Sequence, residues 1–209
     1  MILNISQRTI WLVLLIAPLI LLGISHLFFQ HFLMMKPCEQ CVYIRFYMLM
    51  IALGAFIAFI NPKKLKIIAY LFLIYGLFFG FKHSIILDEI HHSINSDDIF
   101  AKVKTCKNEP QFIFNIKFDE LMPDFFRPSG TCGIDHPIIS DDEKLNSIQQ
   151  FFVGTKINNF EDGLYSNGWY LIPSKKFINM AQACMIFFAL YALFIIFMIF
   201  KDLKNIKRF

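Results

Sequence analysis

The sequence predicts an all-α membrane protein, a bundle of four transmembrane helices, from its composition and the length of its apolar runs. Hydrophobic residues make up 56% of the 209, and 26 are Phe, which is too apolar for an ordinary soluble domain. A helix needs roughly 20 apolar residues to cross a hydrocarbon core. Four runs have that length, at about residues 9–29, 42–60, 65–87 and 177–200. We therefore expect a single integral membrane domain over residues 1–209, and nothing in the composition indicates binding to nucleic acid.

The first run shares some features with a cleavable signal peptide. Arg8 precedes it, and Gly23-Ile24-Ser25 offers small residues at a cleavage spacing. The apolar stretch continues to Phe29, which favours a retained span over a short signal sequence. Cleavage remains an alternative, and it would leave the later topology unchanged.

The positive charges predict the orientation in the membrane. If four spans alternate, eight cations fall on one side, opposed only by Asp202; they are Arg8, Lys63, Lys64, Lys66, Lys201, Lys204, Lys207 and Arg208. A basic bias marks the cytoplasmic side, so we expect both termini there. The long loop 88–176 is then periplasmic, and it carries 14 of the 16 acidic residues against nine basic ones.

The periplasmic loop has two periodic stretches. Phe112, Phe114, Ile116 and Phe118 alternate with other residues, which predicts a short strand. The spacing of Leu145, Ile148, Phe151 and Phe152 predicts an amphipathic helix at the membrane interface. We expect a turn at Asn167-Gly168, followed by interfacial aromatic residues at Trp169-Tyr170.

Four of the five cysteines form two pairs. Cys38 and Cys41 have two residues between them, and Cys106 and Cys132 have 25. All four lie outside or at the outer interface, which is the oxidising compartment of a bacterial cell. Cys184 lies inside the fourth run and is best interpreted as a small buried apolar residue.

The first cysteine pair stands where the second span begins. Pro37 precedes Cys38, so the pair occupies a helix N-terminus, where free amide groups and the macrodipole favour a thiolate. Arg45 is four residues beyond Cys41 and hence one turn deeper on the same face. There it can stabilise that sulfur or a polar group bound beside it. An arginine inside a membrane is by default a functional hypothesis.

Other interpretations of the cysteines remain open. Attachment of a c-type haem requires His at position 42, where the residue is Val42. A zinc site built from the four cysteines has compatible ligand types, with further candidates in His91, His92 and His136. Two structural disulfides are common outside the cytoplasm. Against these, a Cys-x-x-Cys pair closes a very small loop and is a frequent redox arrangement.

The stretch Pro37-Cys38-Glu39-Gln40-Cys41-Val42-Tyr43-Ile44-Arg45 resembles the Cys-x-x-Cys-x-Tyr-x-Arg signature of the DsbB/DsbI family of bacterial inner-membrane disulfide-generating proteins. The four spans and the second cysteine pair before the last span match as well. The order of the pairs separates the chain from the vitamin K epoxide reductase relatives, in which the loop pair comes first. The extension over about residues 133–169 is longer than in compact members and resembles the DsbI branch.

The resemblance implies a quinone-dependent thiol oxidoreductase in the inner membrane, with its active cysteines on the periplasmic side. Cys106 would form the mixed disulfide with a soluble thioredoxin-fold oxidase of the DsbA type, and Cys132 would exchange with Cys38. Cys41 would face the quinone, ubiquinone or menaquinone, and Arg45 would hold its head group. The flanking Lys104 and Lys107 favour thiolate chemistry at Cys106, independently of the resemblance.

The energetics agree with a quinone acceptor. DsbA-type proteins are strong oxidants, with a reduction potential of about −120 mV, and the relay of DsbA, DsbB and quinone is known to keep the periplasm oxidising. A glutathione-like pool is too reducing to drive it. The alternative function class is a non-catalytic membrane protein whose outer loops are held by structural disulfides or zinc and bind another protein.

Overall fold

The computed structural model describes residues 7–62, 64–95, 106, 109–139 and 144–206, and its main elements are long helices. They are α1 (Gln7–Gly23), continued by the π-helix η1 (Ile24–Phe32), α2 (Glu39–Ile60), α3 (Lys66–Asn95) and α7 (Met180–Ile206). Within the described residues, four stretches are long and apolar enough to cross a membrane: Gln7–Phe32, Glu39–Ile60, Lys66–Ile94 and Met180–Asp202. The prediction of four spanning helices is thereby confirmed.

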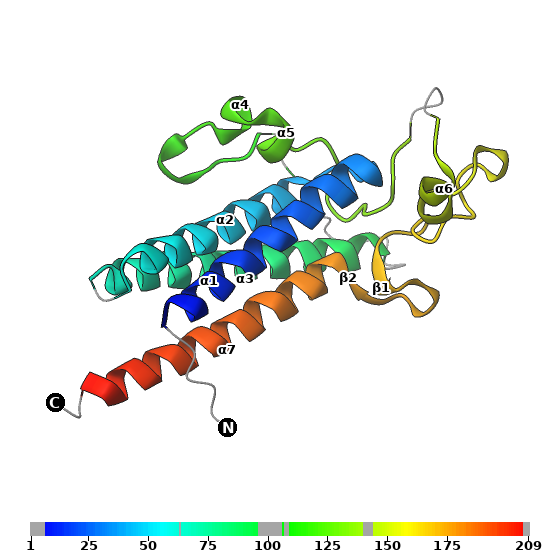
Figure 1. Cartoon of the computed structure of the whole chain (residues 1–209). Coiled ribbons are helices and arrows are strands. Elements are labelled where there is room, and N and C mark those ends of the chain that lie inside the picture. Colours follow the sequence, from blue (N-terminus) through cyan, green and yellow to red (C-terminus); the bar gives the residue numbers. More distant parts are fainter. Residues whose placement is uncertain (1–6, 63, 96–105, 107–108, 140–143, 207–209) are drawn as a thin grey trace.

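The four helices run alongside one another (Figure 1). The start of α1, the turn between α2 and α3, and the far end of α7 lie at one end of the bundle, while α6 and the two strands lie at the other. Side chains join the first end: Trp11 packs on Tyr70 with ring centroids 5.5 Å apart, and the Tyr70 hydroxyl donates to Asp202 at 2.8 Å. This arrangement agrees with two termini on one side of the membrane, and which side that is remains a prediction.

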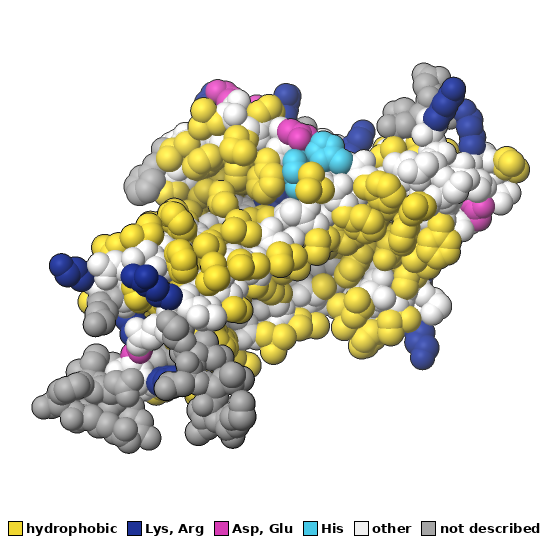
Figure 2. Space-filling view, viewed as in Figure 1, with side chains coloured by type: hydrophobic (Ala, Val, Ile, Leu, Met, Phe, Trp, Pro, Cys, Tyr) yellow, Lys and Arg dark blue, Asp and Glu magenta, His cyan; other side chains and the backbone are white. Residues whose placement is uncertain are grey.

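Helix α2 forms the centre of the bundle. In its most apolar window 61% of the residues are buried, against 17% for α1 and for α7. Close approach of α3 depends on Gly76, where an added Cβ would lie 2.7 Å from Ile51. Apolar side chains cover most of the visible exterior of the bundle (Figure 2), as expected for helices that face lipid.

Short elements make up most of the described chain between α3 and α7. They are η2 (Ile113–Asn115), α4 (Phe118–Leu121), α5 (Pro123–Phe126), α6 (Ser147–Val153), η3 (Lys156–Asn158), β1 (Tyr170–Ile172), η4 (Pro173–Lys175) and β2 (Phe177–Asn179). Strands β1 and β2 pair antiparallel, with Tyr170 opposite Asn179. Their hairpin leads directly into α7.

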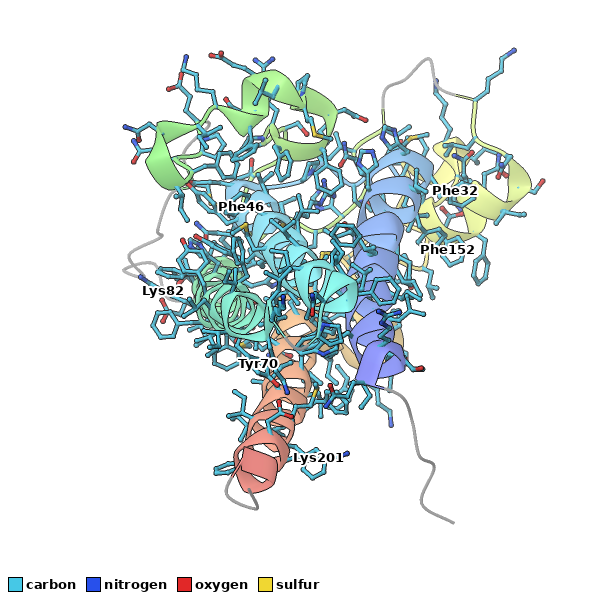
Figure 3. All side chains as sticks on the ribbon, turned by 60° about the vertical axis from the view of Figure 1, so that its left-hand side comes forward. Phe32, Phe46, Tyr70, Lys82, Phe152 and Lys201 are labelled. Atoms are coloured by element: carbon cyan, nitrogen blue, oxygen red, sulfur yellow. A yellow bond between two sulfur atoms is a disulfide. The ribbon has the colours of Figure 1, made fainter. Side chains whose placement is uncertain are left out.

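The strand expected over residues 112–118 is wrong, because these residues form the 3-10 turn η2 and the start of α4. Phe112 and Phe118 pack together against Phe46 of α2 instead of alternating on a sheet, with centroids 5.2 and 5.4 Å from the Phe46 ring. Phe46 faces the segment that carries α4 and α5 (Figure 3). An aromatic cluster has therefore replaced the strand.

The helix expected around residues 145–152 is confirmed as α6, and its place at the membrane interface stays a prediction. Its N-terminus is closed by a capping box, in which the Gln149 amide donates to Asn146 Oδ1 at 2.8 Å and the Asn146 amide donates to Gln149 Oε1 at 3.0 Å. Several helix boundaries differ from the predicted spans, two of them at the ends of the long loop. Helix α3 continues beyond residue 87 to Asn95, and α7 begins at Met180 because Phe177–Asn179 forms β2. The predicted cationic positions Lys63, Lys104, Lys107, Lys207 and Arg208 lie outside the described residues.

Candidate redox site

Cys38 is the N-cap of α2. Its Sγ accepts a hydrogen bond from the backbone amide of Cys41 at 3.2 Å, so the sulfur binds one of the free amides at the start of the helix. Cys38 is 2% exposed, whereas Cys41 is half-buried. Both thiols are free in this structure. The pair therefore has one protected sulfur and one more accessible sulfur.

The loop before Cys132 docks on the segment before Cys38. The amides of Ser129 and Gly130 both donate to the Pro37 carbonyl, at 2.9 and 3.0 Å. The approach is so close that a Cβ on Gly130 would lie 2.4 Å from the carbonyl oxygen of Lys36. Backbone contacts therefore hold the two cysteine-bearing segments together.

Cys106 and Cys132 form a disulfide, with Cα atoms 6.0 Å apart. Cys132 is 2% exposed and belongs to the same apolar cluster as Cys38; Cys41, Cys106 and Cys184 pack against that cluster. All five cysteines thus gather around one core, although the two pairs are far apart in the chain. Because their sulfurs are bonded to each other, Cys106 and Cys132 cannot ligate zinc in this state.

The environment of Cys38 favours the thiol over the thiolate. Burial raises the pKa of Cys38, and the neighbouring Cys41 and the Asp135 carboxylate act in the same direction. The hydrogen bond from the Cys41 amide opposes this rise, with a smaller effect. The helix N-terminus alone had indicated a thiolate, but loss of solvent outweighs it in this closed arrangement.

A buried histidine–aspartate pair that sequence reasoning missed lies near this core. His91 Nε2 is 2.9 Å from Asp135 Oδ2, and the two side chains are 7% and 5% exposed. Asp135 follows Cys132 by three residues, and its carbonyl accepts from the Trp169 amide at 3.1 Å. The sequence indicates His91 as a candidate zinc ligand and does not reveal its carboxylate partner. In the sequence, Asp135 stands out only as an acidic residue just after Cys132, and no neighbouring residue indicates that its partner is His91.

Arg45 is buried and joins three segments. Its Nη1 donates to Gln30 Oε1 at 2.6 Å and to the Phe125 carbonyl at 3.3 Å, while Nη2 donates to the Ser25 carbonyl at 3.0 Å. The guanidinium carbon also lies 5.5 Å from the centre of the Phe125 ring. Among the described residues, three of its N–H groups are engaged, which leaves two of the five for a bound molecule.

Two other residues of the Cys-x-x-Cys-x-Tyr-x-Arg stretch position their surroundings. Gln40 Oε1 lies 2.7 Å from His83 Nδ1, which connects the residue between the two cysteines to α3. The Tyr43 hydroxyl accepts from the Gln111 amide at 2.7 Å. Tyr43 therefore anchors the chain a few residues after Cys106.

Comparisons with known proteins agree with this geometry. The family described as "Disulfide bond formation protein DsbB" matches residues 7–198. A DsbI protein of Campylobacter fetus is 48% identical over 187 residues, covering 88% of this chain and 82% of the relative. The protein-disulfide oxidoreductase DsbI of Salmonella typhimurium is 45% identical over 192 residues, covering 88% and 81%. The chain belongs to the DsbB family of disulfide bond formation proteins.

Proposed function

We propose that this protein is a membrane thiol oxidoreductase that reoxidises a periplasmic, DsbA-type disulfide donor. Electrons would pass through Cys106/Cys132 and then Cys38/Cys41 to a membrane quinone, ubiquinone or menaquinone. The observation that supports this most is the docking of the Cys132 loop on Pro37, next to Cys38. The relatives named protein-disulfide oxidoreductase point to the same reaction class.

The first exchange oxidises the soluble partner. A partner thiolate attacks Cys106, the S–S bond to Cys132 breaks, and a mixed disulfide forms on Cys106. The second partner thiol then displaces Cys106, so the partner leaves as a disulfide and the loop pair is left reduced. Cys106 suits this attack because it is half-buried, whereas Cys132 is enclosed.

The second exchange is internal. The Cys132 thiolate attacks Cys38 of an oxidised Cys38–Cys41 pair and releases Cys41 as a thiolate. Cys106 then attacks Cys132, which restores the Cys106–Cys132 disulfide and leaves Cys38 and Cys41 reduced. The structure has this distribution of bonds, with the loop pair joined and Cys38 and Cys41 free.

The region around Arg45 fits a quinone head group. Its guanidinium has two N–H groups not engaged by the described residues, Phe125 lies over it, and Cys41 lies one turn away on the same helix. Arg45 would bind a head-group oxygen, and Cys41 would be the nearer thiol. A bound quinone supplies an acceptor for two electrons and two protons. The chain would do this in the bacterial inner membrane with both termini cytoplasmic, as the positive charges predict.

The decisive test is the redox state of Cys38 and Cys41 in isolated membranes as quinone supply is varied. Alkylation of free thiols followed by mass spectrometry should show the pair reduced in quinone-depleted membranes and oxidised after quinone is restored. If the redox state of Cys38 and Cys41 does not change with quinone supply, the result would support the alternative, a non-catalytic membrane protein with structural disulfides. The absorption spectrum of the purified protein provides an independent check for bound quinone.

A further inference from the structure

Three side chains with metal-ligating atoms meet where the outer end of α1 passes the loop that carries α5. They are His26 and His31 of η1 and Asp124 of α5. Asp124 Oδ2 lies 3.4 Å from His26 Nε2 and 3.0 Å from His31 Nε2, and the three donor atoms all lie within 4.8 Å of one another. Figure 2 shows histidine side chains beside an acidic group on the exposed surface near this end of α1.

The π-helical turn brings the two histidines together. In an α-helix of 3.6 residues per turn, side chains five apart point roughly 140° away from each other. A π-helix bonds each residue to the fifth one along, so residues 26 and 31 fall on the same face of η1. Their rings accordingly lie 4.7 Å apart between centroids. Rare π-helical segments often mark functional sites, and this one assembles a ligand pair.

The hydrogen bonds around Gln30 determine which nitrogen of His26 carries its proton. Gln30 Nε2 donates to the Asp124 carbonyl at 2.6 Å, and Gln30 Oε1 accepts from Arg45 at 2.6 Å, so the orientation of the amide is set from both sides. The same Oε1 lies 3.3 Å from His26 Nδ1, which must therefore be the donor. With the proton on Nδ1, the lone pair of Nε2 faces the Asp124 carboxylate. Two acceptors face each other, and a positive charge is needed between them.

We propose that His26, His31 and Asp124 bind a divalent transition-metal ion of the zinc class. Imidazole and carboxylate are ligands that zinc accepts, and Zn–N bonds of about 2.0–2.1 Å place tetrahedral donor atoms roughly 3.3 Å apart. The two N···O separations, 3.4 and 3.0 Å, are close to this value. The bond from His26 Nδ1 to Gln30 is the outer hydrogen bond that orients a metal-bound histidine. His31 and Asp124 are 50% and 64% exposed, so an ion reaches them from solvent.

The bound ion would clamp α5 to η1 beside the buried arginine. Gln30 contacts His26, Asp124 and Arg45, and therefore connects the ion to the guanidinium. The ion would stabilise the position of Phe125, which packs on both His26 and Arg45. Metal binding is independent of the proposed electron transfer and can be measured without it.

The test uses the full chain, purified in detergent, stripped with a chelator and dialysed against Co²⁺ or Zn²⁺. Wild type should bind one ion per chain at this site, and the cobalt spectrum should lack sulfur-to-metal charge transfer. Affinity should fall at least about tenfold in His31→Ala and in Asp124→Asn, since even outer-shell partners are worth about 10–100-fold. His92→Ala is the matched control. His92 also lies near a carboxylate, 3.8 Å from Asp88, but among the described residues it is not part of the His26, His31 and Asp124 group, so this variant should bind the ion as wild type does.

Three results would overturn the proposal: no bound ion in wild type, equal binding in Asp124→Asn and wild type, or a cobalt spectrum dominated by thiolate ligands. The last would assign the ion to the free cysteines. An intact Cys106–Cys132 disulfide and unchanged elution on size exclusion establish that each variant is folded.

Discussion

Two neighbouring regions between α3 and α7 are held in opposite ways. Residues 109–139 depend on the membrane helices, because their backbone is bonded to Tyr43, Arg45 and Pro37. Residues 144–179 are held mostly by hydrogen bonds among themselves. These are the α6 capping box, the β1–β2 hairpin and the bonds from the Leu164 and Tyr165 amides to carbonyls at the end of α6.

This second region also packs on the end of η1, where Val153 is buried in one apolar cluster with Leu33 and Met35. Phe152 of α6 packs against Phe28, with centroids 5.8 Å apart, and Phe32 and Phe152 lie near each other (Figure 3). Gln149 Nε2 also donates to the Phe32 carbonyl at 3.0 Å. We expect from this difference that the first region aligns the cysteines, and that the second, which reaches them through the bond from the Trp169 amide to the Asp135 carbonyl, affects them less. The predictions below test this separation.

Gly130→Ala should have the largest effect, because it disrupts the docking of the first region. The added Cβ would meet the Lys36 carbonyl at 2.4 Å, forcing a shift of about 1 Å, and such misplacement can cost about 100-fold in rate. A soluble quinone analogue added to fully reduced protein should still oxidise Cys38/Cys41 at the normal rate. The disulfide should then appear on Cys106/Cys132 about 100-fold more slowly, as followed by quenched alkylation. Gly23→Ala, where nothing lies within 4 Å, is the control and should not slow either step.

Arg45→Ala should show the reverse pattern in the same experiment. A hydrogen bond to a charged group contributes about 1.5–3 kcal/mol, so the rate at which the quinone analogue oxidises Cys38/Cys41 should fall about 10- to 100-fold. Transfer to Cys106/Cys132 should be affected less. The control is Arg127→Ala, which removes an exposed cation from the same region. Equal losses in both steps would indicate that Arg45 serves packing alone.

Asp135→Asn should change the titration of Cys38. Burial is the main cause of the raised pKa, and the Asp135 carboxylate adds to it, so removing that charge lowers the pKa of Cys38. The pH profile for alkylation of Cys38 in reduced protein should move to lower pH. An unchanged profile would show that the carboxylate does not act on the sulfur. Asp162→Asn, in the second region, is the matched control.

Asp162→Asn should have the smallest effect, confined to the loop over residues 155–162. Hydrogen bonds from the Thr155 amide, the Thr155 hydroxyl and the Asn158 side chain lower the pKa of Asp162 from 3.8 to about 2. A depressed folded-state pKa contributes stability above the unfolded value, and that contribution is lost as pH falls from about 4 to 2. Hydrogen exchange at Thr155 should accelerate over this window, and Asp162→Asn should accelerate it already at neutral pH. Slower thiol exchange in this variant would contradict the separation of the two regions.

The sequence contained enough to predict the spans and the cysteine pairs. Apolar run length identifies a spanning helix from local residues alone, and Cys38, Cys41 and Arg45 fall within eight consecutive positions. The docking of Gly130 on Lys36 and the His91–Asp135 pair join residues far apart in the chain, so no local pattern reports them. The strand at residues 112–118 was predicted wrongly because alternating aromatic residues also suit a cluster packed on Phe46.

The most direct test of the proposed electron transfer is a disulfide cross-link between the two cysteine pairs. In a Cys41→Ser, Cys106→Ser double variant, Cys38 and Cys132 remain, both buried in the same apolar cluster beside the docked loop, and Cys184 packs against that cluster. Mild oxidation with diamide should join Cys38 to Cys132, and mass spectrometry of the digested protein should recover that linked peptide pair. Recovery of Cys38 linked to Cys184 instead, or of both thiols free after oxidation, would contradict the proposed internal exchange.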